Sequence, residues 1–424
     1  MGDADNCIVV RPSGPIRGEV LVPGAKNSVL KLMAACLLAE GEFELTNVPG
    51  IVDVRIMAEL LTASGRDVTF IEGYEVVQIV NCGDLEPVAP PALVAKMRAS
   101  INVLGPLLGR CGWAQLHLPG GDDFGARPID LHVDGLQRMG ATIAVSGGRL
   151  DASADRLRGA DIVFEFPSVG ATENLLTAAV LAEGVTTIDN AAREPEIIDL
   201  CDFLVKMGAR IDGIGTSRLT ITGVERDALH GCHHETVPDR IQAATYIAAC
   251  AVSGGELDLL NAKPEHMTMV LTRFHDMGLE FGQLPYGLQV RSTGRLVAAD
   301  VATLPYPGIA TDYKPLIITM LSVADGVGVV TENLYPGRFR YVEELRRLGA
   351  DIALDGHHAV VTGVPELVGC DVESHDIRAG AAMVVAGLAA TGATRISGIH
   401  HIDRGYDDLV GRLQRVGADI ERIG

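Results

Sequence analysis

The sequence lacks the marks of several common protein classes. Its eight cysteines include no C-x-x-C pair, which argues against zinc-ribbon or thioredoxin chemistry. Its most apolar run, residues 379–390, is too short to span a bilayer and predicts a buried helix instead. It contains no G-x-S-x-G element, no P-loop lysine motif and no G-x-G-x-x-G fingerprint. These absences argue against several familiar hydrolase and nucleotide-binding families.

Positive charge is also scarce, since 35 lysines and arginines stand against 55 aspartates and glutamates, for a net charge of −20. This balance argues against general binding to nucleic acid or to anionic membranes. A few converging basic side chains would still be enough to bind an anionic substrate. The 424 residues, 47% hydrophobic and 21% charged, indicate a well-packed protein of two or three domains. Without a secretory hydrophobic segment, we expect a reduced, cytoplasmic setting.

Two glycine series in register reveal a sixfold internal repeat of about 70 residues. In each copy, both glycines follow a helix-like apolar segment and precede a strand-like one. The repeat therefore predicts an α/β unit of two helices, each followed by a strand. The first series is Gly41, Gly112, Gly184, Gly255, Gly326 and Gly392, and the second is Gly65, Gly140, Gly208, Gly278, Gly349 and Gly417.

Units of this size cannot bury their apolar faces alone, so we expect them to associate. Segments 28–38 and 172–181 are apolar around much of their circumference, which is typical of helices buried inside a domain. Six units can group as three plus three, with the polar, turn-rich segment 229–238 as the connector. This grouping predicts two lobes, and clefts between lobes are common ligand sites.

Segment 118–128 combines three glycines, two prolines, an arginine and two adjacent aspartates. Its glycines permit a close backbone approach to a ligand, and Arg127 can hold an anion. Asp122 or Asp123 can transfer a proton. An ordinary surface turn with solvated aspartates would have the same composition.

Charged or polar residues also stand at the starts of several apolar segments. Together they suggest one anionic site, because backbone N–H groups at a helix start add to the positive field. Independent, solvated helix caps are the alternative, since capping would explain each case separately. The histidine pairs at 233–234 and 357–358 lack a ligand frame with cysteine or glutamate, so we predict no metal site. The helix-start residues are Lys26, Asn27, Arg98, Ser168, Asp312, Lys314, Asp376, Arg378, Asp403 and Arg404.

These motifs together resemble those of the enolpyruvyl transferases over nearly the whole chain. Segment 97–100 differs from the Asn-Ala-Gly-Thr of the shikimate-pathway branch and favours the branch that uses a nucleotide sugar. The motifs that carry the resemblance are Gly24-Ala-Lys-Asn27, Met97-Arg-Ala-Ser100, Leu118-Pro-Gly-Gly121, Gly125-Ala-Arg-Pro-Ile-Asp-Leu-His132, Ser168-Val-Gly-Ala-Thr172, Asn190-Ala-Ala-Arg-Glu-Pro-Glu196 and His401-Ile-Asp-Arg-Gly-Tyr406.

The resemblance implies an α/β fold of two inside-out, barrel-like lobes, each made of three βαβαββ-like repeats. Helices would be buried and sheets would lie outside. One lobe would span residues 26–236 and carry the Asp122 loop, and the other would combine residues 1–25 with 237–424. The active site would lie in the cleft between the lobes.

The resemblance also implies a reaction without a cofactor. The enolpyruvyl group of phosphoenolpyruvate would move to the 3-hydroxyl of UDP-N-acetylglucosamine with release of phosphate, an early step of peptidoglycan synthesis. Asp122 would act as the general acid, and Asp312 would take the proton of the acceptor hydroxyl. Phosphoenolpyruvate would be bound, and its charge neutralised, by Lys26, Arg127, Arg338, Arg378 and Arg404, among which Lys26 and Arg404 would also be catalytic. The uridine nucleotide and its sugar would contact Asn27, Arg98, Arg127, Pro128, Asp130, His132, Ser168, Val169, Gly170, Asp312 and Leu334.

Three departures from the family pattern keep alternatives open. Asp122 replaces the usual loop cysteine, as in a subset that includes mycobacterial members, so fosfomycin should not inactivate the protein covalently. Residues 309–314 read Ile-Ala-Thr-Asp-Tyr-Lys in place of Phe-Pro-Thr-Asp-Leu/Met-Gln, and residues 336–339 read Pro-Gly-Arg-Phe in place of Glu-Asn-Arg-Phe. A paralogue that uses UMP or another uridine nucleotide in nucleoside-antibiotic synthesis would fit these changes. A silent nucleotide-binding regulator is a further alternative.

Overall fold

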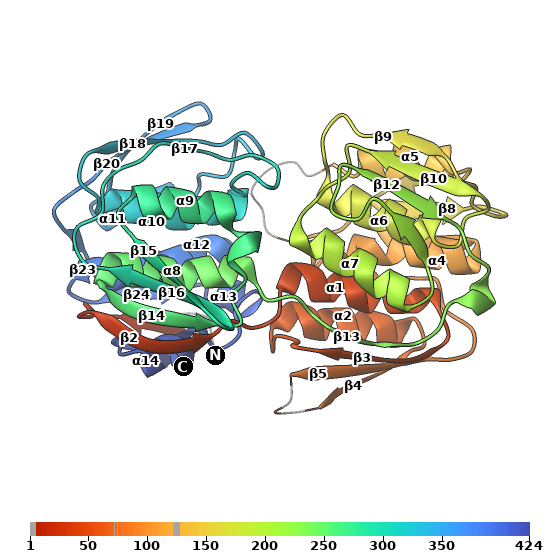
Figure 1. Cartoon of the computed structure of the whole chain (residues 1–424), viewed down its shortest axis with the longest axis horizontal. Helices are drawn as coiled ribbons and strands as arrows, with labels where there is room; N and C mark the ends of the chain where they lie inside the picture. The colour runs from red at the N-terminus through yellow and green to blue at the C-terminus, as the bar shows by residue number, and fades with distance from the viewer. Residues whose placement is uncertain (1–5, 72, 74, 122–127) are drawn as a thin grey trace. The chain divides into compact units, whose positions relative to one another are not determined.

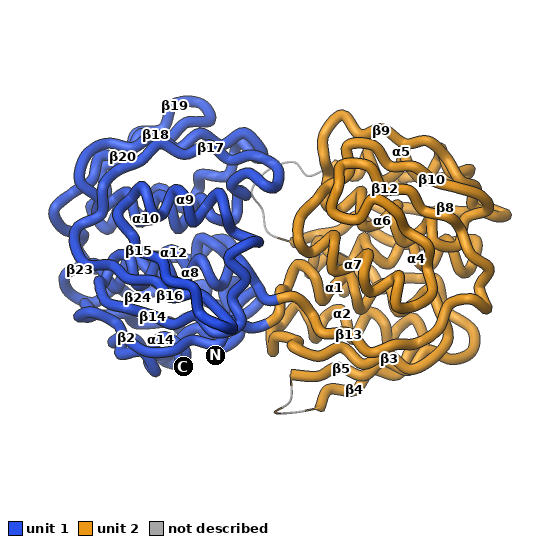
Figure 2. The backbone as a smooth tube through the Cα atoms, viewed as in Figure 1, with its two compact units in different colours: residues 1–23, 122–125, 238–424 blue, residues 24–121, 126–237 orange. Residues whose placement is uncertain are grey.

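The structure is a computed structural model that describes residues 6–71, 73, 75–121 and 128–424. The predicted site residues Asp122 and Arg127 therefore lie outside the described residues. Two compact units divide the chain (Figures 1 and 2). Of the described residues, unit 1 holds those up to Pro23 and those from Pro238 onward, and unit 2 holds those from Gly24 to Val237.

Three sheets form the outside of unit 2, in the orders β13-β3-β5-β4, β6-β8-β7 and β11-β12-β10-β9. Burial alternates along most of their strands, so each sheet has one face on the core and one on the solvent. The strands are β3 (Gly41–Thr46), β4 (Asp67–Ile71), β5 (Val76–Asn81), β6 (Trp113–His117), β7 (Thr142–Ser146), β8 (Arg149–Ser153), β9 (Asp161–Val163), β10 (Val185–Asp189), β11 (Arg210–Asp212), β12 (Arg218–Thr222) and β13 (His233–Glu235).

The helices of unit 2 include three that are buried on nearly every side, namely α1, α4 and α6. The buried helices expected at segments 28–38 and 172–181 are confirmed, the first as α1 continued by the 3₁₀ turn η1. The helices are α1 (Lys26–Ala35), α2 (Val52–Ala63), α3 (Pro91–Val94), α4 (Leu104–Cys111), α5 (Asp130–Arg138), α6 (Val169–Ala179) and α7 (Pro195–Lys206), with 3₁₀ segments η1 (Cys36–Leu38), η2 (Arg98–Val103) and η3 (Arg226–Ala228).

Unit 1 repeats this plan with sheets in the orders β15-β16-β14-β2, β17-β18-β20-β19 and β22-β24-β1-β25, and with the strand pair β21-β23. Its strands are β1 (Cys7–Val10), β2 (Ile16–Leu21), β14 (Gly255–Leu260), β15 (Glu280–Leu284), β16 (Gly287–Ser292), β17 (Val301–Ala302), β18 (Val327–Thr331), β19 (Asp351–Asp355), β20 (His358–Thr362), β21 (Leu367–Val368), β22 (Asp371–Glu373), β23 (Ala390–Thr391), β24 (Thr394–Ser397) and β25 (Ile420–Ile423).

Helices α8, α10 and α12 pack against one another in the middle of unit 1 (Figure 1). Every residue of α10 is buried, and α12 confirms the buried helix expected at segment 379–390. No helix among the described residues has both the length and the apolar character needed to cross a membrane. The helices are α8 (Arg240–Ser253), α9 (Thr268–Asp276), α10 (Lys314–Ser322), α11 (Val342–Arg347), α12 (Ile377–Ala389), α13 (His400–Asp403) and α14 (Leu409–Arg415), with η4 (Pro264–His266) and η5 (Thr311–Tyr313).

The glycine periodicity has a direct conformational cause. All twelve glycines of the two series have positive φ, between +74° and +134°. Residues with a Cβ rarely adopt this backbone conformation, which lets the chain turn sharply from a helix into the next strand. In a complete repeat, such as β9-α6-β10-α7-β11-β12, the strand before the buried helix pairs in parallel with the strand after it. The predicted sixfold α/β repeat is therefore confirmed.

Two strands break this local rule. β2 directly precedes α1 of unit 2, yet it pairs in parallel with β14 of unit 1. β13 directly precedes α8 of unit 1, yet it pairs in parallel with β3 of unit 2. The turn-rich connector expected at 229–238 therefore contains a strand, which corrects that part of the sequence analysis. Unit 1 therefore contains β2, which the repeat pattern assigns to unit 2, and unit 2 contains β13, which the pattern assigns to unit 1.

Candidate functional site

Lys26 is the first residue of α1, and its ammonium is anchored inside unit 2. Its Nζ lies 2.8 Å from Oδ2 of Asp53 in the first turn of α2, and Asp53 is fully buried. Gly24, two residues before α1, packs closely against the backbone of Asn47. Only glycine fits there, because a Cβ would lie 1.7 Å from the carbonyl oxygen of Asn47. Asn27 follows and is half-buried. The helix start therefore presents a positioned cation beside a polar amide side chain.

His132 lies on α5, and its tautomer is fixed by Asn174 of α6. The Asn174 amide nitrogen lies 3.0 Å from Nδ1 of His132 and also donates to the carbonyl oxygen of Ile101, while its amide oxygen accepts from Gly105 N. Nδ1 is therefore the acceptor, and the ring proton belongs on Nε2. Burial, helped by the positive charge of Arg98, lowers the pKa of His132 to about 4. His132 is thus a neutral imidazole that can donate from Nε2.

The Nε2 edge of His132 lies beside the start of α6. A Cβ on Gly170 would sit 3.3 Å from Nε2 and from Cε1, so only glycine leaves this edge open without displacement. Ser168 caps the helix, and its hydroxyl accepts from Ala171 N. The free N–H groups of Val169 and Gly170 belong to the first turn of α6. Helix N–H groups and a neutral imidazole donor together suit a phosphate group.

Arg98 lies near His132, whose pKa it affects. Its Nη2 donates a hydrogen bond to the carbonyl oxygen of Pro128 over 3.3 Å. Asp130 is exposed at the first position of α5, and it and Arg98 both act electrostatically on His132. The helix start expected at residues 96–100 is present as a 3₁₀ segment, since η2 begins at Arg98 and α4 follows it from Leu104. Pro106 has no N–H to bond to residue 102, so it is tolerated in the first turn of α4 but would disrupt an α-helix that began further back.

Asp312 is the centre of a charged group in unit 1. Its Oδ1 accepts from Arg338 Nη1 over 2.7 Å, and its Oδ2 accepts from Arg378 Nε over 3.4 Å. Burial alone would raise the pKa of Asp312, but Arg338, Arg378 and Arg240 outweigh it and hold that pKa well below its usual range. The carboxylate therefore stays ionised and can accept a hydrogen bond from a hydroxyl group.

The two arginines that face Asp312 are almost fully buried. Arg338 also lies 3.7 Å from Asp376, which caps α12 by accepting from the N–H groups of Arg378 and Ala379. Burial alone would lower the pKa of Arg338 and Arg378, yet nearby oxygens, above all Asp312 for Arg338 and Tyr406 for Arg378, raise both pKa values. Both side chains thus remain cations that could neutralise an anionic substrate.

Arg404 and Leu334 occupy less regular positions. Arg404 was expected just before an apolar helix, but it is the C-cap of the short helix α13 and is half-buried. Arg404 and Gly405 form a turn after α13, and the ring centre of the next residue, Tyr406, lies 5.4 Å from the Arg378 guanidinium. Leu334 is half-buried in the loop after β18, and its backbone N–H donates to Glu332.

The structure reveals three residues that the sequence motifs did not identify, and a fourth whose role they misassigned. Asn174 and Glu332 carried no motif signal of their own. Arg240 starts the apolar helix α8 and lies 5.6 and 5.8 Å from the rings of Tyr306 and Tyr313, so the helix-start pattern could have identified it. Lys314 was expected to contribute to an anionic site, but its ammonium is fully buried against Glu332.

The predicted site residues that the structure describes fall into two sets. The set in unit 2 is Lys26, Asn27, Arg98, Pro128, Asp130, His132, Ser168, Val169 and Gly170, and the set in unit 1 is Asp312, Leu334, Arg338, Arg378 and Arg404. Within these sets, the structure brings His132 to Gly170, Arg98 to Pro128, and Asp312 to Arg338 and Arg378. Among the described residues, no group of three or more histidines, cysteines, aspartates or glutamates is placed to hold a metal ion.

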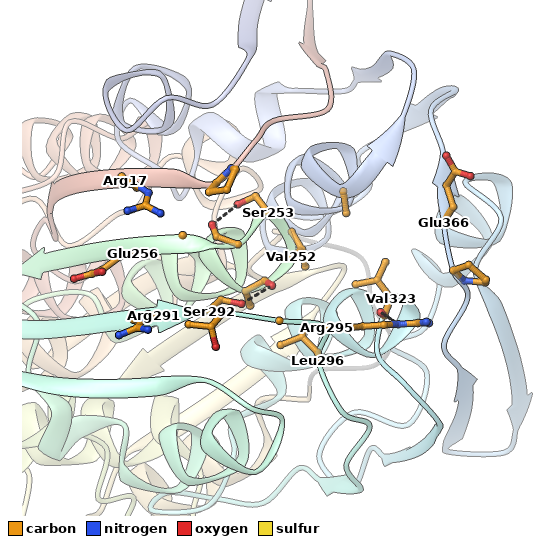
Figure 3. Close-up of a pocket in the computed structure, with 18 residues that line it drawn as sticks. Arg17, Val252, Ser253, Glu256, Arg291, Ser292, Arg295, Leu296, Val323 and Glu366 are labelled. Atoms are coloured by element: carbon orange, nitrogen blue, oxygen red, sulfur yellow. Dashed lines mark hydrogen bonds between the residues drawn. The ribbon is translucent and has the colours of Figure 1, made fainter.

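A cavity of about 710 Å3 in unit 1 contains none of these residues (Figure 3). Arg17, Glu256 and Arg291 stand opposite one another on three adjacent strands at its wall, so their charges alternate. Arg295 donates to the carbonyl oxygens of Val323, Ala324 and Val364. Because these arginines already face a glutamate or backbone carbonyl oxygens, we do not interpret the cavity as an anion-binding site.

Comparisons with known proteins agree in family and fold. Residues 10–413 match the family model described as EPSP synthase (3-phosphoshikimate 1-carboxyvinyltransferase). The chain is 50% identical over 415 residues to the UDP-N-acetylglucosamine 1-carboxyvinyltransferase of Mycolicibacterium paratuberculosis, covering 98% of this chain and 99% of the relative. It is 45% identical to the enzyme of the same name from Rhodospirillum centenum, covering 98% of each.

Solved structures confirm the expected fold class. The crystal structure of the enolpyruvyl transferase NikO from Streptomyces tendae matches with a TM-score of 0.90 at 24% identity, covering 99% of both chains. EPSP synthase from Acinetobacter baumannii matches with a TM-score of 0.75 at 19% identity, covering 99% of this chain and 100% of that one. At these identities the likeness establishes the fold alone.

Proposed function

Because the chain belongs to the EPSP synthase family, we propose that it transfers the enolpyruvyl group of phosphoenolpyruvate to the 3-hydroxyl of UDP-N-acetylglucosamine. The observation that carries this proposal is the 50% identity, over nearly the full length of both chains, to a UDP-N-acetylglucosamine 1-carboxyvinyltransferase. We place the reaction at the start of peptidoglycan synthesis, in the cytoplasm.

Five basic side chains neutralise phosphoenolpyruvate in this proposal. Lys26 contributes an ammonium that Asp53 already orients, and Arg338 and Arg378 contribute buried guanidinium groups. Arg127 and Arg404 complete the set. Such fixed cations stabilise the charge that develops during addition and elimination, without the reorganisation that water would need.

Two carboxyl groups move the protons. Asp312 accepts the proton of the acceptor hydroxyl, whose oxygen attacks C2 of phosphoenolpyruvate, while Asp122 protonates its C3 methylene. The resulting tetrahedral adduct then loses a proton from C3 and expels inorganic phosphate, which restores the double bond. Asp122 must be protonated to act as the acid, although its reference pKa is about 3.9, so phosphate charge or burial has to raise that pKa.

The start of α6 binds the uridine diphosphate. The N–H groups of Val169 and Gly170, the Ser168 hydroxyl and Nε2–H of His132 can all donate hydrogen bonds to phosphate oxygens. Arg98 adds charge, Pro128 and Asp130 contact the uridine, and Arg127 serves both substrates. Asn27 and Leu334 contact the sugar, which presents its 3-hydroxyl to Asp312.

The test is an acceptor assay. Purified protein is incubated with phosphoenolpyruvate and either UDP-N-acetylglucosamine or UMP, and phosphate release is measured. We expect release with the nucleotide sugar, abolished in Asp122→Ala. Release with UMP alone would replace the cell-wall role by the nucleoside-antibiotic one. Nucleotide binding without any release would identify a silent regulator instead.

A further inference from the structure

A second charged pair is joined to the surroundings of Asp312 through Thr311 and Arg338. Lys314 and Glu332 are both fully buried, and their Nζ and Oε2 atoms are 2.9 Å apart. Lys314 begins α10, and Glu332 follows β18. Neither side chain reaches solvent, so neither can contact a substrate. Their contacts nevertheless lead to the groups that the proposed reaction uses.

Glu332 connects several separate segments of unit 1 through its carboxylate. Oε1 accepts from the Thr303 hydroxyl over 2.7 Å and from the N–H groups of Leu334 and Tyr335 over 2.8 and 3.0 Å. Oε2 accepts from the Thr311 hydroxyl over 2.7 Å. One carboxylate therefore fixes both the loop that carries Leu334 and the residue preceding Asp312.

Lys314 holds the other side of the same group. Its Nζ donates to the carbonyl oxygen of Arg338 over 2.5 Å and lies 3.8 Å from the centre of the Phe339 ring. The backbone of Arg338 is thereby fixed where its guanidinium reaches Asp312 Oδ1 over 2.7 Å. The two segments that depart from the family pattern, at residues 309–314 and 336–339, thus meet at one ammonium group.

Stability alone gives little reason to bury this pair. Removing two charges from water is unfavourable enough that well-packed apolar side chains of similar volume are often as stable or more stable. The Glu332 carboxylate accepts from five donors, and the Lys314 ammonium donates to the Arg338 carbonyl oxygen. Apolar side chains could make none of these bonds. What the charged pair provides is a defined geometry around Asp312.

We infer that Lys314 and Glu332 are positioning residues, which hold Asp312 and Arg338 in the geometry that the acceptor hydroxyl requires. This inference rests on the proposed function for its catalytic meaning. Catalysis is sensitive to such geometry, because a displacement of about 1 Å can lower the rate on the order of 100-fold. The pair acts through Asp312 and Arg338 and not on the substrate itself.

Two substitutions at Lys314 test the inference. Lys314→Met keeps the aliphatic stem but loses the ammonium, and should lower kcat/KM for the acceptor on the order of 100-fold. Lys314→Gln keeps a neutral donor and should recover most of that loss. Arg412→Met is the matched control, because Arg412 is a buried cation of unit 1 that bonds to Asp407 and the Leu21 carbonyl oxygen. It should lower the melting temperature and leave kcat/KM of the folded protein unchanged.

Hydrogen exchange of residues 333–338 gives a readout that needs no turnover. The N–H groups of Leu334 and Tyr335 should exchange on the order of tenfold faster in Lys314→Met than in the unsubstituted protein, but not in Arg412→Met. Unchanged exchange together with unchanged kcat/KM in a folded Lys314→Met protein would overturn the inference. A protein that releases no phosphate at all would refute the proposed function, while the exchange comparison would still decide whether the pair positions this loop.

Discussion

Replacing Asn174 with leucine removes three hydrogen bonds at the centre of unit 2 while nearly keeping the side-chain volume. Gly105 N loses its acceptor, the Ile101 carbonyl oxygen loses a donor, and His132 Nδ1 loses the donor that fixes its tautomer. Gly105 lies in the first turn of α4, where backbone N–H groups have no partner inside the helix. The Asn174 side chain therefore acts as a cap supplied by another helix.

The size of the effect follows from these contacts. Each buried polar group left without a partner costs about 1–3 kcal/mol, and the extra apolar surface of leucine offsets part of this. We expect the free energy of unfolding to fall by about 2–5 kcal/mol, which in a unit of this size lowers Tm by roughly 4–20 °C. Because His132 can then rotate or change tautomer, we also expect binding of UDP-N-acetylglucosamine to weaken about tenfold.

Urea unfolding and titration calorimetry of the same preparations measure both effects. Thr177→Val is the control, because Thr177 is buried in the same helix and its hydroxyl bonds only to the backbone oxygens of Glu173 and Asn174. It should reduce stability slightly and leave nucleotide binding unchanged. A folded Asn174→Leu protein that binds the nucleotide sugar as tightly as the unsubstituted protein would refute the role assigned to His132. Equal loss of binding in both variants would point to a general disturbance of α6.

Three sites and two fragments provide further tests. Burial raises the pKa of Glu173 to about 7, so the folded protein holds this proton more tightly than the unfolded chain does. The free energy of unfolding should therefore fall by up to about 3 kcal/mol as pH rises from about 4.5 to about 7. Urea titrations should show this trend, and Glu173→Gln should remove it. Fosfomycin should form no adduct with the unsubstituted protein but should alkylate Asp122→Cys, as mass spectrometry would reveal. Asp312→Asn should lower kcat on the order of 100-fold or more with little change in KM for phosphoenolpyruvate. Residues 24–237 expressed alone should unfold cooperatively in urea, whereas residues 238–424 should not.

The repeat was predictable because it depends on local chemistry. A glycine with positive φ, such as Gly184 or Gly208, is needed wherever a helix turns sharply into a strand, so the period is visible in the sequence. Helices such as α12 are apolar on every side, which identifies them as central. The charge pattern at residues 96–100 identified a helix start, but not the change from the 3₁₀ segment η2 to α4. Pro106, whose missing N–H limits how early an α-helix can begin, is the residue that could have indicated it.

The candidate site was predictable only where a side chain carries its own motif. Asp312 and Ser168 belong to recognisable segments, and the structure places them where charge or helix N–H groups concentrate. Asn174 and Glu332 act by accepting from backbone groups far along the chain, and such contacts leave no periodic trace in the sequence. Lys314 is the reverse case, because its motif suggested a role in binding an anionic substrate that its contacts do not support. Its ammonium is paired with Glu332, 18 positions later, and nothing in the sequence indicates that pairing.

The exchanged strands β2 and β13 explain why the two fragments should differ. Every strand of the three sheets of unit 2 lies between Gly24 and Val237, so that fragment contains its complete core. Unit 1 instead needs β1 in the middle of one sheet, between β24 and β25, and β2 at the edge of another. Ile8, Val10, Ile16 and Val20 from these strands are at most 2% exposed in its core. Without them, residues 238–424 would expose both the apolar faces and the unpaired backbone of two sheets, and such edges favour aggregation over folding. The order of the chain therefore requires unit 1 to form from both ends of the sequence, and adding a peptide of residues 1–23 should restore cooperative unfolding to the C-terminal fragment.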